Sequence, residues 1–388
     1  LALSASEFVG TTTVRAEDLC AIIYTTRATT PPRGCMLTNN SFVIPAKAAG
    51  LLPIQPGDAD YTCLPLFHIN AQIYSALGMM AVGGTLILSD RFSPTKFWHE
   101  LFTYKPKFFN SIGSITQILY SLPPTAKDTI QPARYAIANG TPKQLWVKFE
   151  QRFNVTIIEG YSQTEDPLPF LNYSKPRKAV GSFGVPVFPD LGHEIKIIDE
   201  NRKEVPPDIR GELIRRSPCT MVGYWNDPVS TGATIHDGWL YTGDIVVGSA
   251  EGFISFVENK QFLVRRADES IAPWEVESTI KDLPKIEDCA VIPVPDAVKG
   301  QEIKALVKLR AGQTEETCPQ REIVGWTAQR LAYFKVPRYI EYTDALPYIP
   351  TGRLDKAKLY EEHRNKQTHG WDRDKEMPDW RTQLYKAI

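Results

Sequence analysis

Residues 237–244 of this 388-residue sequence read DGWLYTGD, and the interpretation of the whole chain is built outward from this stretch. In the plain structural reading, Thr242-Gly243-Asp244 forms a β-turn, because aspartate beside glycine suits a turn. In the functional reading, the Asp244 carboxylate is a hydrogen-bond acceptor for a ligand. The segments before and after this stretch decide between the two readings.

Strand-like and helix-like segments alternate along the chain, which predicts an α/β fold with largely parallel sheets. From about Val180 the spacing shortens and glycines separate short β runs, which indicates a β-rich subdomain. The strand candidates are Cys20–Tyr24, Tyr61–Leu64, Thr85–Leu88, Thr156–Glu159, Glu194–Ile198, Gly211–Arg215 and Phe253–Val257, and the helix candidates are Ser41–Gly50, Thr95–Tyr104 and Lys143–Phe153.

A polar stretch at 258–261 is a candidate hinge, and the pattern of the residues beyond it predicts a small α+β domain. We therefore divide the chain into a large N-terminal domain of mixed sheets and helices (1–257), a small C-terminal domain (258–362) and a charged tail (363–388), which we expect to be an extended or partly ordered appendage. The elements expected after the hinge are the helix Trp274–Asp282, the strands Asp288–Val294 and Glu302–Leu309, and the helix Glu322–Ala332.

Composition excludes several classes of protein. The net charge of −1 gives no overall field that would attract nucleic acid or an anionic membrane, and no apolar run is long enough for a membrane span. The six cysteines contain no CxxC pair and are expected to be free thiols, which indicates a reducing compartment such as the cytoplasm. The N-terminus has no signal-peptide pattern and no initial methionine, so we expect that the natural start is missing.

Residues 24–34, YTTRATTPPRG, follow an apolar run and combine hydroxyl groups with two arginines. A loop of this composition after a strand is a candidate phosphate site. It has a single glycine, Gly34, at its end, so the residues alone leave open whether it holds phosphate or is the remnant of a loop that did.

Further segments stand in a fixed order around these two. They are Leu64–His68 (LPLFH), Gly160–Glu165 (GYSQTE), Gly211–Leu213 with Gly223–Tyr224 (GEL and GY), and Pro347–Arg353 (PYIPTGR). In this order, from about Asp18 to Leu359, the chain resembles the adenylate-forming superfamily of acyl-CoA synthetases, luciferases and peptide-synthetase adenylation domains. Phe67-His68, Phe97-Trp98 and Phe334–Pro337 resemble its carnitine/crotonobetaine-CoA ligase-type branch. The family's portion ahead of the phosphate loop is not in this sequence.

The resemblance implies a two-step reaction that joins a carboxylic acid to a thiol. The acid attacks the α-phosphate of ATP, with Mg²⁺, to give an acyl-adenylate and pyrophosphate; the small C-terminal domain then moves, and CoA or another thiol carrier attacks the adenylate. Such a site must neutralise the triphosphate, align the carboxylate and keep out water. The expected substrate is a small or medium organic acid, and a homodimer is possible.

The resemblance also assigns roles to individual residues. Asp244 would bind the ribose, Glu165 the Mg²⁺, and Thr164 a phosphate; Tyr161 would stack on adenine, and His68 would gate the carboxylate pocket. Each has a plain alternative as a turn, cap or core residue. The remaining nucleotide-binding candidates are Thr26, Thr29, Thr30, Arg33, Asn139, Gly140, Thr141, Glu159, Gly160 and Asn259. The acid pocket is expected near His68, Ile69, 111–115 and 160–162.

Four parts of the family pattern are altered. Arg27, Ala28 and Thr30 replace a Gly, a Thr and a Gly of the phosphate loop, and Arg33 replaces its lysine, so close approach of backbone to phosphate is harder. We expect Arg33 and Thr29 to face the phosphate and Arg27 to point outward. At the hinge, Glu258-Asn259 stands where the family has an Asp-Arg pair, and Lys260 is retained next to it.

The predicted thiol-tunnel residues are Arg266, Ala267 and Asp268, and the family's Gly-Gly-Glu-Asn-like turn there reads Ala267-Asp268-Glu269-Ser270, without the two glycines. The near-terminal catalytic lysine is replaced by Arg353, whose planar guanidinium differs from a compact ammonium. Three hypotheses therefore stay open. The chain is an acid–CoA ligase, of full or reduced activity; or it binds a nucleotide or acyl-adenylate without catalysis; or it performs only the thiol-transfer half-reaction. The absence of GxGxxG and GxSxG motifs disfavours a dehydrogenase and a serine hydrolase.

Overall fold

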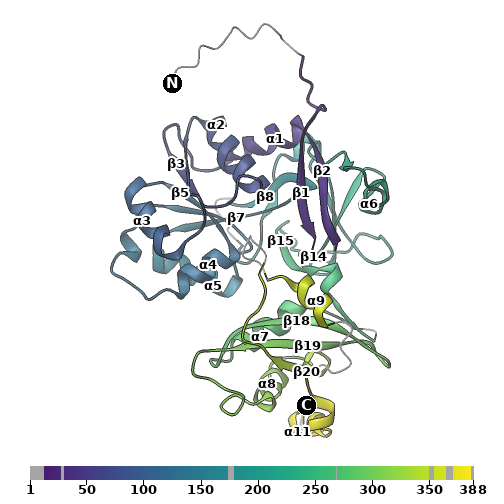
Figure 1. The fold of residues 1–388 in the computed structure, drawn as a ribbon. Helices are drawn as coiled ribbons and strands as arrows, with labels where there is room; N and C mark the ends of the chain where they lie inside the picture. Colours follow the sequence, from purple (N-terminus) through teal and green to yellow (C-terminus); the bar gives the residue numbers. More distant parts are fainter. Residues whose placement is uncertain are drawn as a thin grey trace.

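The computed structural model describes residues 13–27, 30–173, 179–267, 269–348, 354–363 and 370–385. The described strands form four sheets. Figure 1 shows three of them in a larger part, drawn above, and the fourth in a smaller part below, with α9 (Lys356–His363) close to the junction. Within the described ranges no helix has the length and apolar character that a bilayer crossing requires.

The largest sheet has seven strands in the order β4-β3-β5-β6-β7-β8-β9. Neighbours from β4 to β7 are parallel, and β8 and β9 are added antiparallel. The strands are β3 (Ala59–Thr62), β4 (Thr85–Leu88), β5 (Phe108–Ile112), β6 (Tyr135–Asn139), β7 (Thr156–Gln163), β8 (Asp166–Asn172) and β9 (Val185–Pro186). The helices of this region are α1 (Asn39–Ala46), η1 (Lys47–Leu51), the π-helix η2 (Asn70–Leu77), α2 (Gly78–Val82), α3 (Pro94–Tyr104), α4 (Gly113–Ser121), η3 (Asp128–Ile130) and α5 (Lys143–Phe153).

Helix α5 shows why this layer forms. Its apolar residues Trp146, Phe149 and Phe153 recur at helical spacing and are fully buried, and they share one core cluster with Phe97 of α3 and Phe109 of β5. Burial of aromatic side chains of this size contributes about 2 kcal/mol or more each, so the helix is stabilised mainly by packing on the sheet.

Two antiparallel sheets complete the larger part. One is the hairpin β1 (Leu19–Arg27) and β2 (Thr30–Thr38) with β12 (Gly223–Tyr224). The other contains β10 (Glu194–Ile198), β11 (Arg210–Arg216), β14 (Trp239–Gly248), β13 (Ile235–His236) and β15 (Ile254–Asn259), and near these sheets lie η4 (Pro189–Leu191) and α6 (Pro228–Thr234). In the larger part, parallel pairing is therefore confined to β3–β7, whereas the other two sheets, which include the expected β-rich subdomain, are antiparallel.

The smaller part is one six-stranded sheet with helices. Its strands are β16 (Val264–Arg266), β17 (Glu269–Ile271), β18 (Ile286–Asp296), β19 (Gly300–Leu309), β20 (Tyr339–Tyr342) and β21 (Trp371–Asp372), and its helical segments are η5 (Lys260–Phe262), α7 (Pro273–Lys281), α8 (Gln320–Ala328), η6 (Tyr333–Lys335), α9, α10 (Arg373–Glu376) and α11 (Trp380–Leu384).

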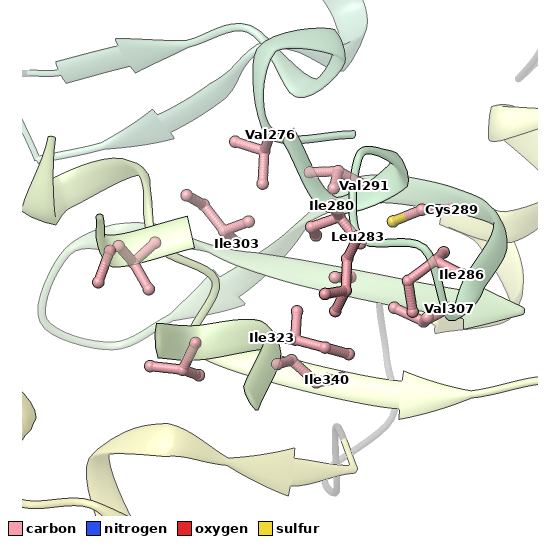
Figure 2. Packing of buried hydrophobic residues seen from close by; sticks show 14 of the residues in the cluster. Val276, Ile280, Leu283, Ile286, Cys289, Val291, Ile303, Val307, Ile323 and Ile340 are labelled. Carbon is pink, nitrogen blue, oxygen red and sulfur yellow. The ribbon is translucent and has the colours of Figure 1, made fainter. Parts of the chain in front are cut away.

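The central strands of this sheet are covered on both faces. Cys289 and Val291 of β18 belong to the cluster that includes Ile280 of α7 and Ile323 of α8, which Figure 2 shows packed between the strands and helices. The alternate residues, such as Ile292, belong to a second cluster with Leu359 of α9. This alternation is the period-2 pattern of a strand buried on two faces.

The charged tail differs from the expected appendage. Trp371–Asp372 pairs as β21 with β20, and Trp380 is buried in the core of the smaller part. Arg373 is fully buried, donates to the carbonyl oxygens of Val336 (2.6 Å) and Pro337 (3.1 Å), and stacks 4.0 Å from the Trp380 ring. The segments are too short to show a period in the sequence, so their packing could not be read from it.

Candidate active site

The best-supported candidate, Asp244, lies on β14 at the centre of a hydrogen-bonded group. Its Oδ2 accepts from the Tyr161 hydroxyl (2.6 Å) and from Gln163 Nε2 (2.8 Å), and its Oδ1 accepts from Asn259 Nδ2 (3.0 Å). Asp244 and Asn259 are also register partners in β14 and β15. The structure thus gathers three predicted nucleotide-binding residues, Tyr161, Asp244 and Asn259, and adds Gln163, which was not predicted although it stands inside GYSQTE.

Tyr161 is held from two sides. Its ring stacks on Phe183 with centroids 4.4 Å apart, and its hydroxyl donates to Asp244. Burial, together with the nearby charge of Asp244, raises the pKa of Tyr161 well above its ordinary value, so the phenol keeps its proton and remains a donor. Phe183 therefore covers one face of the Tyr161 ring.

The turn after β6 is built by Glu159. Its carboxylate accepts the backbone N–H groups of Gly140 and Thr141, the second at 3.2 Å. Gly140 has φ of +77° and Gly113 packs so closely that a Cβ on it would lie 2.2 Å from the Gly140 carbonyl oxygen. Asn139, Gly140, Thr141 and Glu159 are therefore together, but part of the Glu159 carboxylate is used to shape the turn.

Thr164 and Glu165 form the tight turn between β7 and β8, and both are buried. Glu165 Oε1 accepts from the Tyr224 hydroxyl at 2.7 Å. The Arg33 guanidinium lies 5.3 Å from the Tyr224 ring centroid and its Nε lies 3.4 Å from Asp227 Oδ2. Arg33, Tyr224 and Glu165 thus form a connected row, although β2 and β7 are distant in sequence.

The expected phosphate loop is the end of a hairpin. β1 and β2 pair up to Arg27 and Thr30, so most of residues 24–34 are strand rather than loop, which corrects the expectation of a loop. The backbones of Thr26, Arg27 and Thr30 are in these strands. The predicted orientations of Arg27 and Thr29 are not tested, because the Arg27 side chain and all of Thr29 lie outside the described residues, as do the Thr26 and Thr30 side chains, Asp268 and Arg353.

His68 lies just before η2 and is partly buried. Its Nδ1 accepts the backbone N–H of Asn70 (3.1 Å), so the proton of a neutral ring is on Nε2. Asn70 and Tyr74 of η2 line a pocket beside Tyr161, whereas His68 does not. π-Helical turns are frequent at functional sites because they widen the helix and redirect side chains.

The candidate hinge is bound to both parts of the molecule. Lys260 Nζ pairs with Glu212 (2.7 Å), while Glu258 pairs with Lys356 of α9 (2.8 Å). Lys356 also contacts Glu277 of α7 at 3.1 Å. Burial alone would lower the pKa of Lys356, but the charges of Glu277 and Glu258 raise it above the ordinary value. No sequence signal pointed to Lys356 beyond its place three residues after Arg353.

Of the predicted thiol-tunnel residues, Ala267 adopts φ of +53°, the left-handed region that glycine favours. Its N–H donates to the Lys299 carbonyl oxygen (2.8 Å). Arg266 is buried, and its Nε donates to Glu302 (2.8 Å). The backbone at Ala267 therefore has a conformation that favours glycine over alanine.

A cavity of about 50 Å³ lies beside Tyr161. It is lined by Ile137–Asn139 and Gly160–Ser162, together with residues of η1, η2 and α2 and of the segment after η1. Of the residues expected to line an acid pocket, those at 160–162 do so, and His68, Ile69 and 111–115 do not. The contribution of 48–54 was missed, because a helix and loop at the surface carry no motif.

A buried charged group lies close to the pocket, because Arg215 donates to the carbonyl oxygen of Leu168, the residue before the lining residue Pro169. Arg215 and Asp166 form an ion pair (3.1 Å) with fully buried side chains, and Arg215 Nη2 also lies 3.0 Å from His193 Nε2. Burial lowers the pKa of His193 to about 3, and the Arg215 charge lowers it as well. The ring is therefore neutral, with Nδ1–H donating to the Val187 carbonyl oxygen (2.7 Å).

Known proteins resemble this chain over most of its length. Residues 4–225 match the AMP-binding enzyme family and residues 275–353 match the AMP-binding enzyme C-terminal domain. A feruloyl-CoA synthase of Amycolatopsis is 28% identical over 353 residues, which are 89% of this chain and 70% of that protein. A crotonobetaine/carnitine–CoA ligase of Proteus mirabilis is 28% identical over 363 residues, 90% of this chain and 67% of that protein. The crystal structure of ATP-bound MatB from Rhodopseudomonas palustris has the same fold, with a TM-score of 0.86 at 24% identity over 93% of this chain and 71% of that chain.

Proposed function

The chain belongs to the AMP-binding enzyme family, and from this premise we propose that it is an ATP-dependent acid–CoA ligase that works through an acyl-adenylate. The observation that carries the proposal is the group around Asp244. Tyr161, Gln163 and Asn259 hold both carboxylate oxygens in place, as a site for two ribose hydroxyls requires, because a fixed acceptor loses little entropy on binding.

The neighbouring groups supply the other parts of the reaction. With the ribose at Asp244, the phosphates extend toward Glu165 and Arg33, which lie in one connected row. Mg²⁺ in proteins is commonly held by one or two carboxylates together with substrate phosphates. Glu165 fits that role, and the described residues contain no cluster of three or more metal-binding side chains that would form an all-protein site. The pocket beside Tyr161 receives the acid.

A second candidate is a nucleotide or acyl-adenylate binder with little or no adenylation, or one that keeps only thiol transfer. Two observations favour it: Arg33 is paired with Asp227, and Ala267 occupies a left-handed position of the predicted tunnel. The finer assignments are proposals as well. The six free thiols support a reducing cytoplasm, and CoA as acceptor and a homodimer rest on likeness to the family.

The test is acid-dependent exchange of pyrophosphate into ATP, with AMP affinity measured by calorimetry. Asp244→Asn places an amide where both oxygens now accept, so it should weaken AMP binding by about 10- to 100-fold, as loss of one or more charged hydrogen bonds of about 1.5–3 kcal/mol predicts. Asp237→Asn, at an exposed turn of the same segment, is the control and should bind normally.

The outcomes separate the candidates. Exchange with any acid in a broad panel supports the ligase. Binding of AMP without exchange supports the second candidate, and formation of acyl-CoA from a supplied acyl-adenylate then identifies the thiol-transfer version. Equal AMP affinity of the wild type and Asp244→Asn would overturn the placement of the ribose.

A further inference from the structure

The pocket beside Tyr161 differs from the rest of the candidate site in its lack of charge. Five of its lining residues, from η1, α2 and the segment after η1, are apolar: Ala48, Ala49, Leu52, Ile54 and Met79. Pro169 and Leu171 add further apolar surface. None of the described residues that line it is ionised at neutral pH, although 23% of the chain's residues are Asp, Glu, Lys or Arg. This is a pocket for an apolar group, with a small number of uncharged polar side chains in its lining.

The two tyrosine hydroxyls among the lining residues donate their hydrogen bonds to other protein groups. The Tyr161 hydroxyl donates to Asp244, and the Tyr74 hydroxyl donates to the Pro167 carbonyl oxygen (2.5 Å). Burial raises the pKa of Tyr74, so this phenol also stays neutral. The remaining polar lining side chains, Asn70, Asn139 and Ser162, are uncharged amides and a hydroxyl.

The charged side chains near the pocket make contacts with other protein groups. Glu159 holds the turn after β6, and Asp244 is hydrogen-bonded by its three neighbours. Arg215 is paired with Asp166 and lies 5.1 Å from the Phe170 ring centroid. None of them lines the pocket, so a charged substrate tail would have to take a position with no counter-ion among the described lining residues.

Resting on the proposed function, we propose that the acyl pocket selects monocarboxylic acids whose remaining part is uncharged, aliphatic or aromatic. A second carboxylate, a sulfonate or a quaternary ammonium in this pocket would be desolvated without a partner, which is among the most unfavourable changes in binding. Hydroxyl groups are acceptable only where they can reach the side-chain amides of Asn70 or Asn139. In this proposal the acid's own carboxylate lies on the Tyr161 side, where the adenylate forms.

The test uses pairs of acids of equal shape. One pair is adipate and the acid in which an isopropyl group replaces its second carboxylate. The other is γ-trimethylammonio-butyrate and the acid in which tert-butyl replaces trimethylammonium. In pyrophosphate exchange, the neutral member of each pair should have a kcat/KM at least about 100-fold higher. Equal or reversed preference within either pair would overturn the inference while leaving the ligase proposal intact; absence of exchange with every acid would instead overturn the ligase proposal.

A paired substitution tests the pocket itself. Leu52 lines the pocket, whereas Leu51 beside it is 49% exposed and does not. Leu52→Arg supplies a counter-charge and should raise the kcat/KM for adipate relative to its neutral partner by about tenfold or more, and Leu51→Arg should leave the ratio unchanged. If both variants fold and give the wild-type ratio, the acid does not occupy this pocket. If Leu52→Arg does not fold, the isostere pairs still decide, because they need only the unmodified protein.

Discussion

Replacing Lys356 by methionine tests the contact that joins the two parts of the molecule. The Lys356 ammonium lies 2.8 Å from Glu258, at the end of β15, and 3.1 Å from Glu277, in α7. Only 13% of the Lys356 side chain is exposed, and the two carboxylates are exposed by 7% and 10%. Methionine keeps the length and the apolar stem but removes the charge.

The expected cost follows from the burial. Removing one member of a buried ion pair typically costs about 3–5 kcal/mol, because the partner is left charged and poorly solvated. Here two carboxylates would remain close together. Burial already raises the pKa of Glu277 despite the charge of Lys356, so loss of the lysine raises it further. We expect a destabilisation of about 3–5 kcal/mol near pH 8.

The pH dependence has a definite sign. In Lys356→Met the folded-state pKa of Glu277 lies above its unfolded value, so the folded form gains a proton as the pH falls and the deficit in stability shrinks toward pH 5. Urea denaturation at both pH values measures it. Lys358→Met, on the same helix with an exposed side chain and a 4.0 Å contact to Glu362, should cost no more than about 0.5 kcal/mol.

Compensating substitutions remove the remaining ambiguity. Adding Glu258→Gln and Glu277→Gln to Lys356→Met should restore about 2 kcal/mol or more, since neutral amides replace the unpaired charges. A loss under about 1 kcal/mol for Lys356→Met, equal to that of the Lys358→Met control, would refute the reasoning.

Two other predictions concern the backbone and a buried carboxylate. Ala267→Gly should stabilise the protein by about 0.5–1 kcal/mol in thermal or urea unfolding, because the φ angle of Ala267 is +53°. Ala311→Gly, at an exposed position without positive φ, is the control and should destabilise the protein. The opposite order of the two variants would contradict the strain argument. Burial raises the pKa of Asp60 to about 7, although hydrogen bonds from Ser75 and Asn110 oppose the shift. Between about pH 4 and pH 7 the folded state therefore holds a proton that the unfolded state has lost, so the stability of the wild type falls as the pH rises through this window. Asp60→Asn should gain more stability relative to the wild type at pH 8 than at pH 5. A difference in melting temperature between the two proteins that is independent of pH would contradict this.

Several elements were predictable because their signal is local. The helix Lys143–Phe153 and the strands Thr85–Leu88 and Glu194–Ile198 were expected with the bounds that the structure has. The helix expected at Ser41–Gly50 begins two residues earlier, at Asn39, where the Thr38 N–H donates to Ser41 Oγ (3.2 Å). Periodicity and capping depend on neighbours in sequence, which is why they could be read directly.

The segment 24–34 shows the opposite case. Its prolines and hydroxyl groups favour a loop, but β2 pairs with β1 on one side and with Gly223–Tyr224 on the other. A partner almost 190 residues away supplies the hydrogen bonds that decide the conformation. Strand preference depends on such partners more than on the residue types themselves.

The sequence by itself determined the family resemblance, the α/β class and the identity of Asp244 as a candidate, because ordered motifs and local periodicity are properties of neighbouring residues. The tertiary structure decided what surrounds Asp244: Tyr161 and Gln163 from β7 and Asn259 from β15 meet only when three strands are brought together. It also decided the pairing of Lys356 with Glu258 and the uncharged pocket, since counter-ions and cavity walls come from distant segments. DGWLYTGD indicated which carboxylate to consider, and packing decided which atoms hold it in place.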